Sequence, residues 1–221
     1  MKPLPWSHSS LDDFVNCPHA YYEKRIAKSV TEQRTQPMIW GEYVHKQFEN
    51  RQKFGTPLPA DVEEHEEFML FLATRPGQGE YELKVGLNLR MEPCGFFDKQ
   101  VWHRGIVDYR KVHDDHAHIV DYKTGKPHSK FKQLTVNALH TFAALPAVQE
   151  VKVEYYWTTT RQTTGESYTR KDIPILWKTF LPDLRQYAEA FKTDTWQKRQ
   201  SGLCRGYCPV TTCEFWRPRK P

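Results

Sequence analysis

The chain of 221 residues is long enough to bury a core in one domain, or in one domain with appended helices. Its formal net charge of +5 and isoelectric point near 8.9 favour a polyanionic partner without requiring one. No stretch approaches the ~20 apolar residues that cross a bilayer, and Met1–Pro5 is not followed by the apolar core of a signal peptide. We therefore expect a cytoplasmic protein without a membrane segment, in which clustered cysteines bind metal more often than they form disulfides.

The first part of the chain has the pattern of a helix that begins near a serine. Ser7 or Ser9 can cap this helix, which continues through Tyr22. Pro18 is expected to bend or restart it, because proline cannot donate the backbone hydrogen bond that the helix interior needs. Cys17, just before this proline, is either a small buried side chain or a ligand that requires partners elsewhere.

Two further helices are expected before residue 78. One begins after Pro37, and a third covers residues 61–74. His45 lies on the second helix, where a single histidine is more often structural than a metal ligand. The apolar side of this second helix would be formed by Trp40, Tyr43, Val44 and Phe48.

The centre of the sequence predicts β-structure. Residues 80–90 alternate apolar and polar side chains, as a half-buried strand does, and Met91–Val101 has the composition of a loop. Residues 104–126 then predict two strands joined by a turn at His113–Asp115. Cys94, in the loop, has no second cysteine at a ligand-like spacing.

The second strand of this hairpin ends in a charged pair. Because alternate residues of a strand share a face, Asp121 and Lys123 point the same way and Tyr122 the opposite way. Antiparallel pairing can bring Asp108 across from Asp121, and two facing carboxylates favour Mg²⁺ or Mn²⁺ between them. A hairpin with solvated charges is the alternative, but the apolar run that leads up to Asp121 predicts a buried strand, in which a charge needs a partner.

After the hairpin the pattern predicts a helix over 129–145 that carries Gln133 near its start. A strand over 151–160, a turn marked by Gly165 and a strand over 167–173 follow. A final long helix is expected over 175–200. Aromatic side chains are frequent, and Trp6, Tyr21 and Trp216 are examples that could stack on unpaired bases, although most aromatics should lie in the core.

Three cysteines lie close together near the C-terminus, at Cys204, Cys208 and Cys213. In a reducing compartment such a group is a ligand signal, and it requires a fourth ligand. Four thiolates suit either a [4Fe–4S] cluster or structural zinc, and the spacing alone does not choose between them.

The sequence GIVDYR followed by IVDYKTGK resembles the core of the PD-(D/E)XK nuclease superfamily, and within it the RecB-like branch of CRISPR-associated and phage exonucleases. Three further segments resemble motifs of this branch in the expected order, and the C-terminal cysteines match its cysteine cluster. They are Ser7–Tyr22, Gly41–His45 and the helix that carries Gln133. The chain departs from the family motif at Asn137, where the pattern Q-x-x-x-Y has a tyrosine.

The resemblance implies an α/β fold with a restriction-endonuclease-like mixed central sheet flanked by helices, in a single domain over 1–221. Its parts would be a helical segment over 1–78, a catalytic core over about 79–174, and a C-terminal helix with the cysteine cluster over 175–221. The metal ligands that it implies are His45, Asp108, Asp121 and the carbonyl of Tyr122. The cluster ligands that it implies are Cys17, Cys204, Cys208 and Cys213, and this three-plus-one arrangement favours [4Fe–4S] over zinc.

The resemblance also implies roles for the remaining site residues. Lys123 would orient the attacking water and stabilise developing negative charge, and Gln133 would orient the site or contact DNA. Glu82, with Glu80 as its competitor, matches a glutamate that often precedes the core strands and supports the site.

The function implied is a Mg²⁺- or Mn²⁺-dependent DNA exonuclease that acts from 5′ ends of single strands or flaps. A structure-specific DNA endonuclease and a non-catalytic, metal-cluster nucleic-acid-binding protein are the alternatives. DNA is the expected partner, together with recombination, replication or CRISPR-related proteins. The compact chain resembles the phage type, which would act in the cytoplasm of the host.

Overall fold

The computed structural model describes residues 4–218, which divide into two compact units. The core unit is built on the segment Thr35–Trp177. The terminal unit combines Trp6–Arg34 with the segment that begins at Lys178, so it joins residues from both ends of the chain. Each unit is described by itself below.

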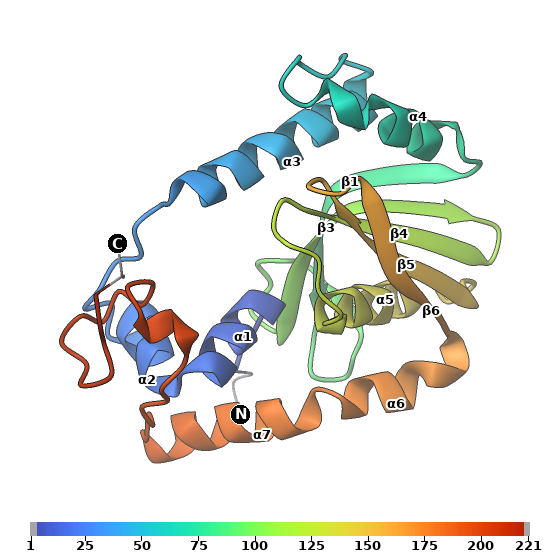
Figure 1. Cartoon of the computed structure of the whole chain (residues 1–221). Coiled ribbons are helices and arrows are strands. Elements are labelled where there is room, and N and C mark those ends of the chain that lie inside the picture. Colours follow the sequence, from blue (N-terminus) through green and yellow to red (C-terminus); the bar gives the residue numbers. More distant parts are fainter. Residues whose placement is uncertain (1–3, 219–221) are drawn as a thin grey trace. The chain divides into compact units, whose positions relative to one another are not determined.

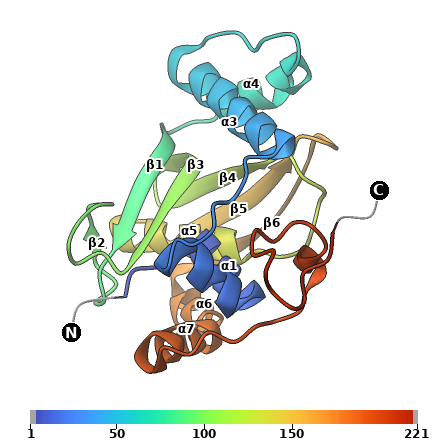
Figure 2. The ribbon, with the colours of Figure 1, turned by 90° about the vertical axis from the view of Figure 1, so that its left-hand side faces the viewer.

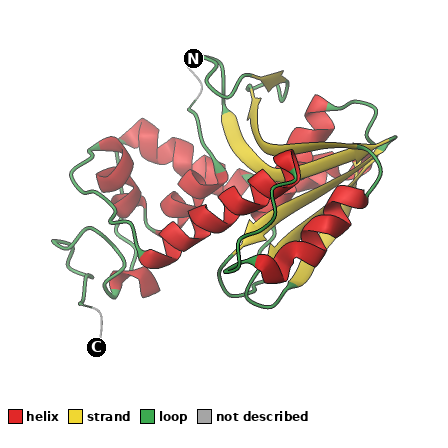
Figure 3. Cartoon of the chain, turned by 90° about the horizontal axis from the view of Figure 1, so that it is seen from above, coloured by secondary structure: helices red, strands yellow, loops and turns green. Residues whose placement is uncertain are grey.

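One mixed sheet of six strands forms the centre of the core unit, as Figures 1 and 3 show. The strand order is β2-β1-β3-β4-β5-β6; β4 and β5 are parallel, and every other neighbouring pair is antiparallel. The strands are β1 (Gln78–Leu87), β2 (Pro93–Cys94), β3 (His103–His113), β4 (His116–Lys123), β5 (Glu150–Trp157) and β6 (Gln162–Thr169).

Helices cover both faces of this sheet. In Figures 1 and 2, α3 (Gln36–Phe54) and α4 (Glu66–Thr74) lie along one face, and α5 (Lys132–Ala144) lies along the other. The short helix η2 (Glu63–His65) precedes α4, and η3 (Arg170–Asp172) and α6 (Ile173–Lys178) follow β6. Side chains of α3, α4 and the sheet form a buried cluster that contains Val44, Phe48, Leu58, Val62, Met69, Leu72, Tyr109, Val120, Tyr122 and Tyr156.

The terminal unit contains α1 (His8–Asn16), α2 (Pro18–Tyr21), the π-helix η1 (Tyr22–Ile26), α7 (Leu181–Thr193) and η4 (Gly202–Cys204). Ser7 caps α1 with its side chain, and Pro18 restarts the chain as α2. An aromatic cluster packs the helices together, with Phe14 edge-on to Tyr21 and Tyr187. No helix in residues 4–218 has the length and apolar character needed to span a membrane.

Most of the predicted elements are confirmed, including the mixed central sheet with flanking helices. The hairpin turns at Asp114, whose φ of 51° lies in the left-handed region that aspartate tolerates. The predicted single domain with three consecutive segments remains a prediction. The two units seen here are not consecutive, because the terminal unit takes residues from both predicted end segments.

Three details of the predicted elements are wrong. The long helix expected over 175–200 is two helices, α6 and α7. Pro182 lies in the first turn of α7, and Asp194, with φ of 50°, caps its C-terminal end. Gly165 lies inside β6 rather than at the turn. Glycine is needed at this position because a Cβ there would lie 2.0 Å from the Val153 carbonyl oxygen of the neighbouring strand. The loop over 91–101 contains the short strand β2.

The structure also places three of the aromatic side chains that the sequence analysis named. Trp40 is 41% exposed, although it was expected on the buried side of its helix. Trp6 and Tyr21 are buried in the terminal unit, so neither can stack on a nucleic-acid base without unfolding. The apolar pattern predicted burial in general but not which aromatic side chains reach the surface.

A buried pair of histidines generates a prediction about stability. Nδ1 of His103 and Nε2 of His140 lie 2.6 Å apart between β3 and α5. Burial, with a smaller contribution from the Arg110 charge, lowers the pKa of His140 to about 3. The unfolded chain therefore binds a proton that the folded chain does not bind between about pH 6.5 and pH 3, so stability is lost as the pH falls through this range.

We expect the His140→Gln variant to lose less stability than the parent between pH 7 and pH 5. The single site contributes up to ~1.4 kcal/mol per pH unit below its unfolded pKa. Urea unfolding of both proteins at the two pH values measures this difference. An identical pH dependence of the unfolding free energy in parent and variant would contradict it.

Candidate active site

The β3–β4 hairpin brings three of the predicted site residues together. Asp108 on β3 accepts a hydrogen bond of 2.8 Å from the backbone N–H of Tyr122 on β4. Asp121 and Lys123 point the same way and form an ion pair, as strand alternation predicted. Asp121 is 1% exposed, so this pair ends a buried strand and is not a solvated surface pair.

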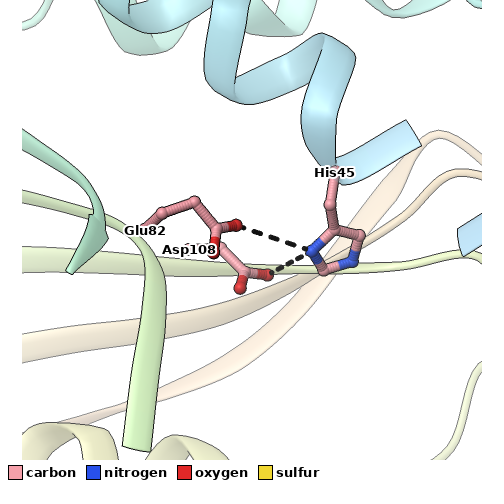
Figure 4. A group of neighbouring side chains, drawn as sticks. All are labelled: His45, Glu82 and Asp108. Carbon is pink, nitrogen blue, oxygen red and sulfur yellow. Dashed lines mark ion pairs between the residues drawn. The ribbon is translucent and has the colours of Figure 1, made fainter. Parts of the chain in front are cut away.

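His45 and Glu82 join Asp108 from two other elements. His45 projects from α3, and its Nδ1 lies 3.3 Å from Oδ2 of Asp108 and 4.0 Å from Oε1 of Glu82 (Figure 4). Each of the three offers one ligand atom, and these atoms all lie within 4.8 Å of one another. An imidazole and two carboxylates in this arrangement can hold a divalent metal ion.

Side-chain alternation along β3 changes at this point. His103 contacts His140 of α5, whereas Tyr109 donates a hydrogen bond of 3.0 Å to the Leu72 carbonyl of α4. Residues six apart in a regular strand share a face, but these two contact helices on opposite faces. Glu82, which lies between the paired residues Tyr81 and Leu83 of β1, has a φ of 48°. A non-glycine residue in this region is strained, and such strain often marks functional sites.

His45 is held with acceptors at both ring nitrogens. Its Nε2 lies 2.9 Å from the carbonyl oxygen of Tyr122. A carbonyl oxygen can only accept a hydrogen bond, so this contact requires a proton on Nε2. Burial opposes the charged imidazole, but the hydrogen bond and charge of Asp108, helped by Asp121, raise the pKa of His45 to about 9. The predicted ligands His45, Asp108 and the Tyr122 carbonyl are therefore adjacent in the structure.

The two candidate glutamates have different surroundings. Burial, followed by the Asp108 charge, raises the pKa of Glu82 to about 6, whereas His45 lowers it. Glu80 points away and accepts hydrogen bonds of 2.7 Å and 2.6 Å from the Arg110 guanidinium. The geometry thus places Glu82, and not its competitor, beside His45 and Asp108.

Gln133 connects the lysine and the aspartate. Its Nε2 donates a 2.6 Å hydrogen bond to Oδ1 of Asp121, and its Oε1 accepts a 2.9 Å hydrogen bond from Nζ of Lys123. Burial raises the pKa of Asp121, the Lys123 ammonium opposes this rise, and the Asp108 charge adds to it. Asn137, where the family pattern has tyrosine, is buried on the next turn of α5.

The sequence analysis missed residues of α3 that line an open pocket over Glu82. This pocket is lined by Gly41, Glu42, His45, Lys46, Glu49 and Glu82. Hydrogen bonds from Lys46 and Lys53 lower the pKa of Glu49 and so keep a further carboxylate charged beside the site. His45 and Glu49 are four residues apart and therefore lie on one face of the helix. This spacing was the signal in the sequence that could have placed Glu49 beside the candidate site.

The four predicted cluster cysteines all belong to the terminal unit. Burial and the nearby Cys17, Cys204 and Cys213 thiols raise the pKa of Cys208, with burial the larger cause. Backbone N–H groups point at two of the sulfurs, from Arg199 to Sγ of Cys17 at 3.4 Å and from Ser201 to Sγ of Cys204 at 3.5 Å.

Comparisons with known proteins agree with this fold. The model of the PD-(D/E)XK nuclease superfamily matches residues 5–83, a range that includes His45 and Glu82 but ends before Asp108. The crystal structure of a "Putative exonuclease" from Eubacterium rectale is similar, with a TM-score of 0.57 and 12% identity over 98% of this chain and 90% of that chain. No curated protein sequence matches the chain significantly.

A second solved structure, that of SSO0001, is similar over 92% of this chain and 84% of that chain, with 14% identity and a TM-score of 0.44. This likeness is too weak to assign a fold. The six-stranded mixed sheet and its flanking helices form a restriction-endonuclease-like fold, in agreement with the family match over residues 5–83. Residues 5–83 thus resemble the PD-(D/E)XK nuclease superfamily, and the fold of the chain is similar to that of the Eubacterium rectale structure.

Glu80 and Glu82 form a matched pair for testing the metal site. We expect Glu82→Gln to weaken Mn²⁺ binding at least about tenfold, because a ligand carboxylate loses its charge. Glu80→Gln should leave Mn²⁺ binding unchanged and lower the free energy of unfolding by ~1 kcal/mol, since it removes the partner of the buried Arg110. Titration calorimetry with Mn²⁺ and thermal unfolding measure the two effects. Equal Mn²⁺ affinities in the two variants would exclude Glu82 as a ligand.

Proposed function

We propose that this protein is a divalent-metal-dependent DNA exonuclease of the RecB-like branch of the PD-(D/E)XK nuclease superfamily. One observation carries the proposal: residues from α3, β1, β3 and β4 converge on one point of the core unit, where His45, Glu82 and Asp108 meet the Tyr122 carbonyl. The ion pair of Asp121 and Lys123 lies beside them, within range of the charges of His45 and Asp108.

The donor set fits a hard divalent cation. Carboxylate and carbonyl oxygens with a single imidazole suit Mg²⁺ or Mn²⁺, and we assign His45, Asp108, Asp121 and the Tyr122 carbonyl as ligands. Glu82 is assigned as a further ligand, because its carboxylate lies in one group with His45 and Asp108. When bound, such an ion polarises the scissile phosphate and lowers the pKa of the attacking water.

Lys123 supplies a fixed positive charge to the reaction. The Gln133 amide and the Asp121 carboxylate hold its Nζ, so the ammonium is oriented before a substrate binds. Its charge would stabilise the negative charge that develops on the phosphate oxygens and would help to orient the water. Gln133 acts by positioning, because it bridges the two charged residues and fixes their separation.

A matched pair of lysines tests this role. We expect Lys123→Ala to lower DNA hydrolysis at least about a hundredfold, because electrostatic stabilisation of the transition state is lost. Lys126→Ala, three residues further along in the exposed loop, is the control and should cleave DNA as the parent does. Digestion of single-stranded and duplex DNA labelled at the 5′ end, the 3′ end or internally, with Mg²⁺ or Mn²⁺, measures activity and polarity together.

The RecB-like resemblance implies release of short products from the 5′ end. Cleavage at internal positions only would instead identify an endonuclease. If the parent binds DNA and cleaves none of these substrates with either ion, the catalytic proposal fails and a nucleic-acid-binding role replaces it.

We also propose that Cys17, Cys204, Cys208 and Cys213 hold a [4Fe–4S] cluster, with zinc as the alternative. The four thiols share one unit although Cys17 is far from the other three in sequence, and backbone N–H groups point at two of the sulfurs. Such donors stabilise thiolates and tune the potentials of clusters. The cluster would fasten the two ends of the chain together and needs no part in the chemistry.

Cys94 is a matched control for this cluster, because it lies in the core unit. We expect the anaerobically reconstituted parent and the Cys94→Ser variant to contain iron and acid-labile sulfide, and the Cys17→Ser variant to contain little of either. Elemental analysis together with visible absorption checks this. Zinc without sulfide in the parent would support the zinc alternative, and no bound metal would reject both.

A further inference from the structure

Beyond the candidate active site, β1 and β3 carry a group of cationic and apolar side chains on paired positions. Lys84 lies opposite Ile106, and Arg104 lies opposite Gly86. Lys84 is exposed and Ile106 is 40% exposed, so this face of the two strands is open to solvent in the core unit.

The loop that follows β1 adds aromatic rings to this group. Nζ of Lys84 lies 6.0 Å from the ring centroid of Phe96 and 5.7 Å from that of Phe97, and the Arg104 guanidinium lies 5.4 Å from Phe96. Phe97 itself is 77% exposed. We call Lys84, Arg104, Ile106 and Phe97 the cationic strip.

Backbone contacts hold this loop in place. The strand β2 pairs with the end of β1, and Gly86 permits this approach because a Cβ there would lie 2.8 Å from the Cys94 carbonyl oxygen. The side chain of Asn88 accepts hydrogen bonds from the N–H groups of Arg90 and Glu92. Phe97 is therefore presented on an anchored loop, which reduces the entropy that ordering it on a ligand would cost.

The charges of the strip are available to a ligand. In the described part of the chain, neither Lys84 nor Arg104 makes an ion pair or a hydrogen bond through its side chain; their contacts are with the aromatic rings. Two uncompensated cations beside an exposed aromatic ring and an exposed isoleucine suit a ligand that has both phosphates and flat apolar faces. An unpaired nucleic-acid strand has this chemistry, whereas duplex DNA hides its base faces.

The strip also continues from the metal-ligand group along the same two strands. Lys84 is two residues from Glu82, and Ile106 and Arg104 are two and four residues from Asp108. At about 3.3 Å per residue, Lys84 and Ile106 lie about 7 Å, and Arg104 about 13 Å, from the metal-ligand group along the strand direction. A strand whose scissile phosphate lies at His45 and Asp108 can therefore reach the strip with its next nucleotides.

We propose that the cationic strip binds the unpaired DNA strand next to the scissile phosphate, with Lys84 and Arg104 on phosphates and Phe97 stacked on a base. The proposal rests on the proposed nuclease function and specifies which surface of the core unit receives the substrate. It assigns single-stranded DNA, over duplex DNA, as the ligand of this surface.

Binding of a fluorescent thymidine decanucleotide, measured by anisotropy in EDTA, tests the strip without cleavage. Phe97→Ala should weaken binding about tenfold, as loss of one stacking contact does. The double variant Lys84→Ala/Arg104→Ala should make the salt dependence of log K shallower by about 1.4, because two phosphate contacts are lost. Phe71→Ala, an exposed phenylalanine of α4, and Lys171→Ala, near the opposite sheet edge, are the matched controls and should bind as the parent does.

Cleavage of a dinucleotide and a decanucleotide separates this proposal from the nuclease proposal. The strip variants should lose more kcat/KM on the decanucleotide than on the dinucleotide, which is too short to reach Phe97. An equal loss on both lengths, or binding equal to that of the control variants, overturns the strip. If the parent cleaves neither substrate but the strip variants weaken binding as expected, the nuclease function fails while the strip stands as a DNA-binding surface.

Discussion

The buried carboxylate of Asp121 is the constraint on which the candidate site depends. Asp121 is 1% exposed at the end of an apolar strand, and an unpaired charge at such a position would strongly destabilise the fold. Lys123 and Gln133 meet this requirement directly, one with a charge and one with a hydrogen bond. The start of α5 and the end of β4 are thereby fixed against each other, and the ammonium group of Lys123 gains a defined position.

On the face of the sheet that α3 covers, apolar packing positions His45. Val44 and Phe48 of α3 are completely buried against Tyr109, Val120 and other members of the core cluster. His45 lies between them in sequence, so the packing that holds α3 on the sheet also holds the imidazole at Asp108. Each large apolar side chain that is fully buried stabilises the fold by ~1.5–3 kcal/mol, more than an exposed ion pair contributes. The apolar core, rather than surface charge, therefore sets the position of His45 in the candidate site.

The positions of the candidate site residues in the fold were largely predictable, because these residues lie within regular elements whose periodicity is visible in the sequence. The alternation in β4 placed Asp121 and Lys123 on one side, and the apolar run before them indicated burial. The apolar pattern over 175–200 continues across Pro182 and Asp194, and it therefore predicts one helix where these two residues interrupt the helical backbone. Trp40 is exposed although the pattern predicts it on the apolar side of its helix. Helical periodicity predicts the face on which a residue lies, but not how far the surface that packs against this face extends.

The sequence by itself therefore determined the class of fold, the hairpin with its charged pair, and the residue types of the candidate site. Only the tertiary structure decided between Glu80 and Glu82, because the left-handed conformation at Glu82 and the change of face in β3 cannot be read from a period of two residues. The tertiary structure also brought Cys17 into one unit with three cysteines nearly two hundred residues away, and Lys84 beside Arg104 and Phe97. Local propensity acts over a few residues, whereas these contacts depend on strand register and on packing between distant segments.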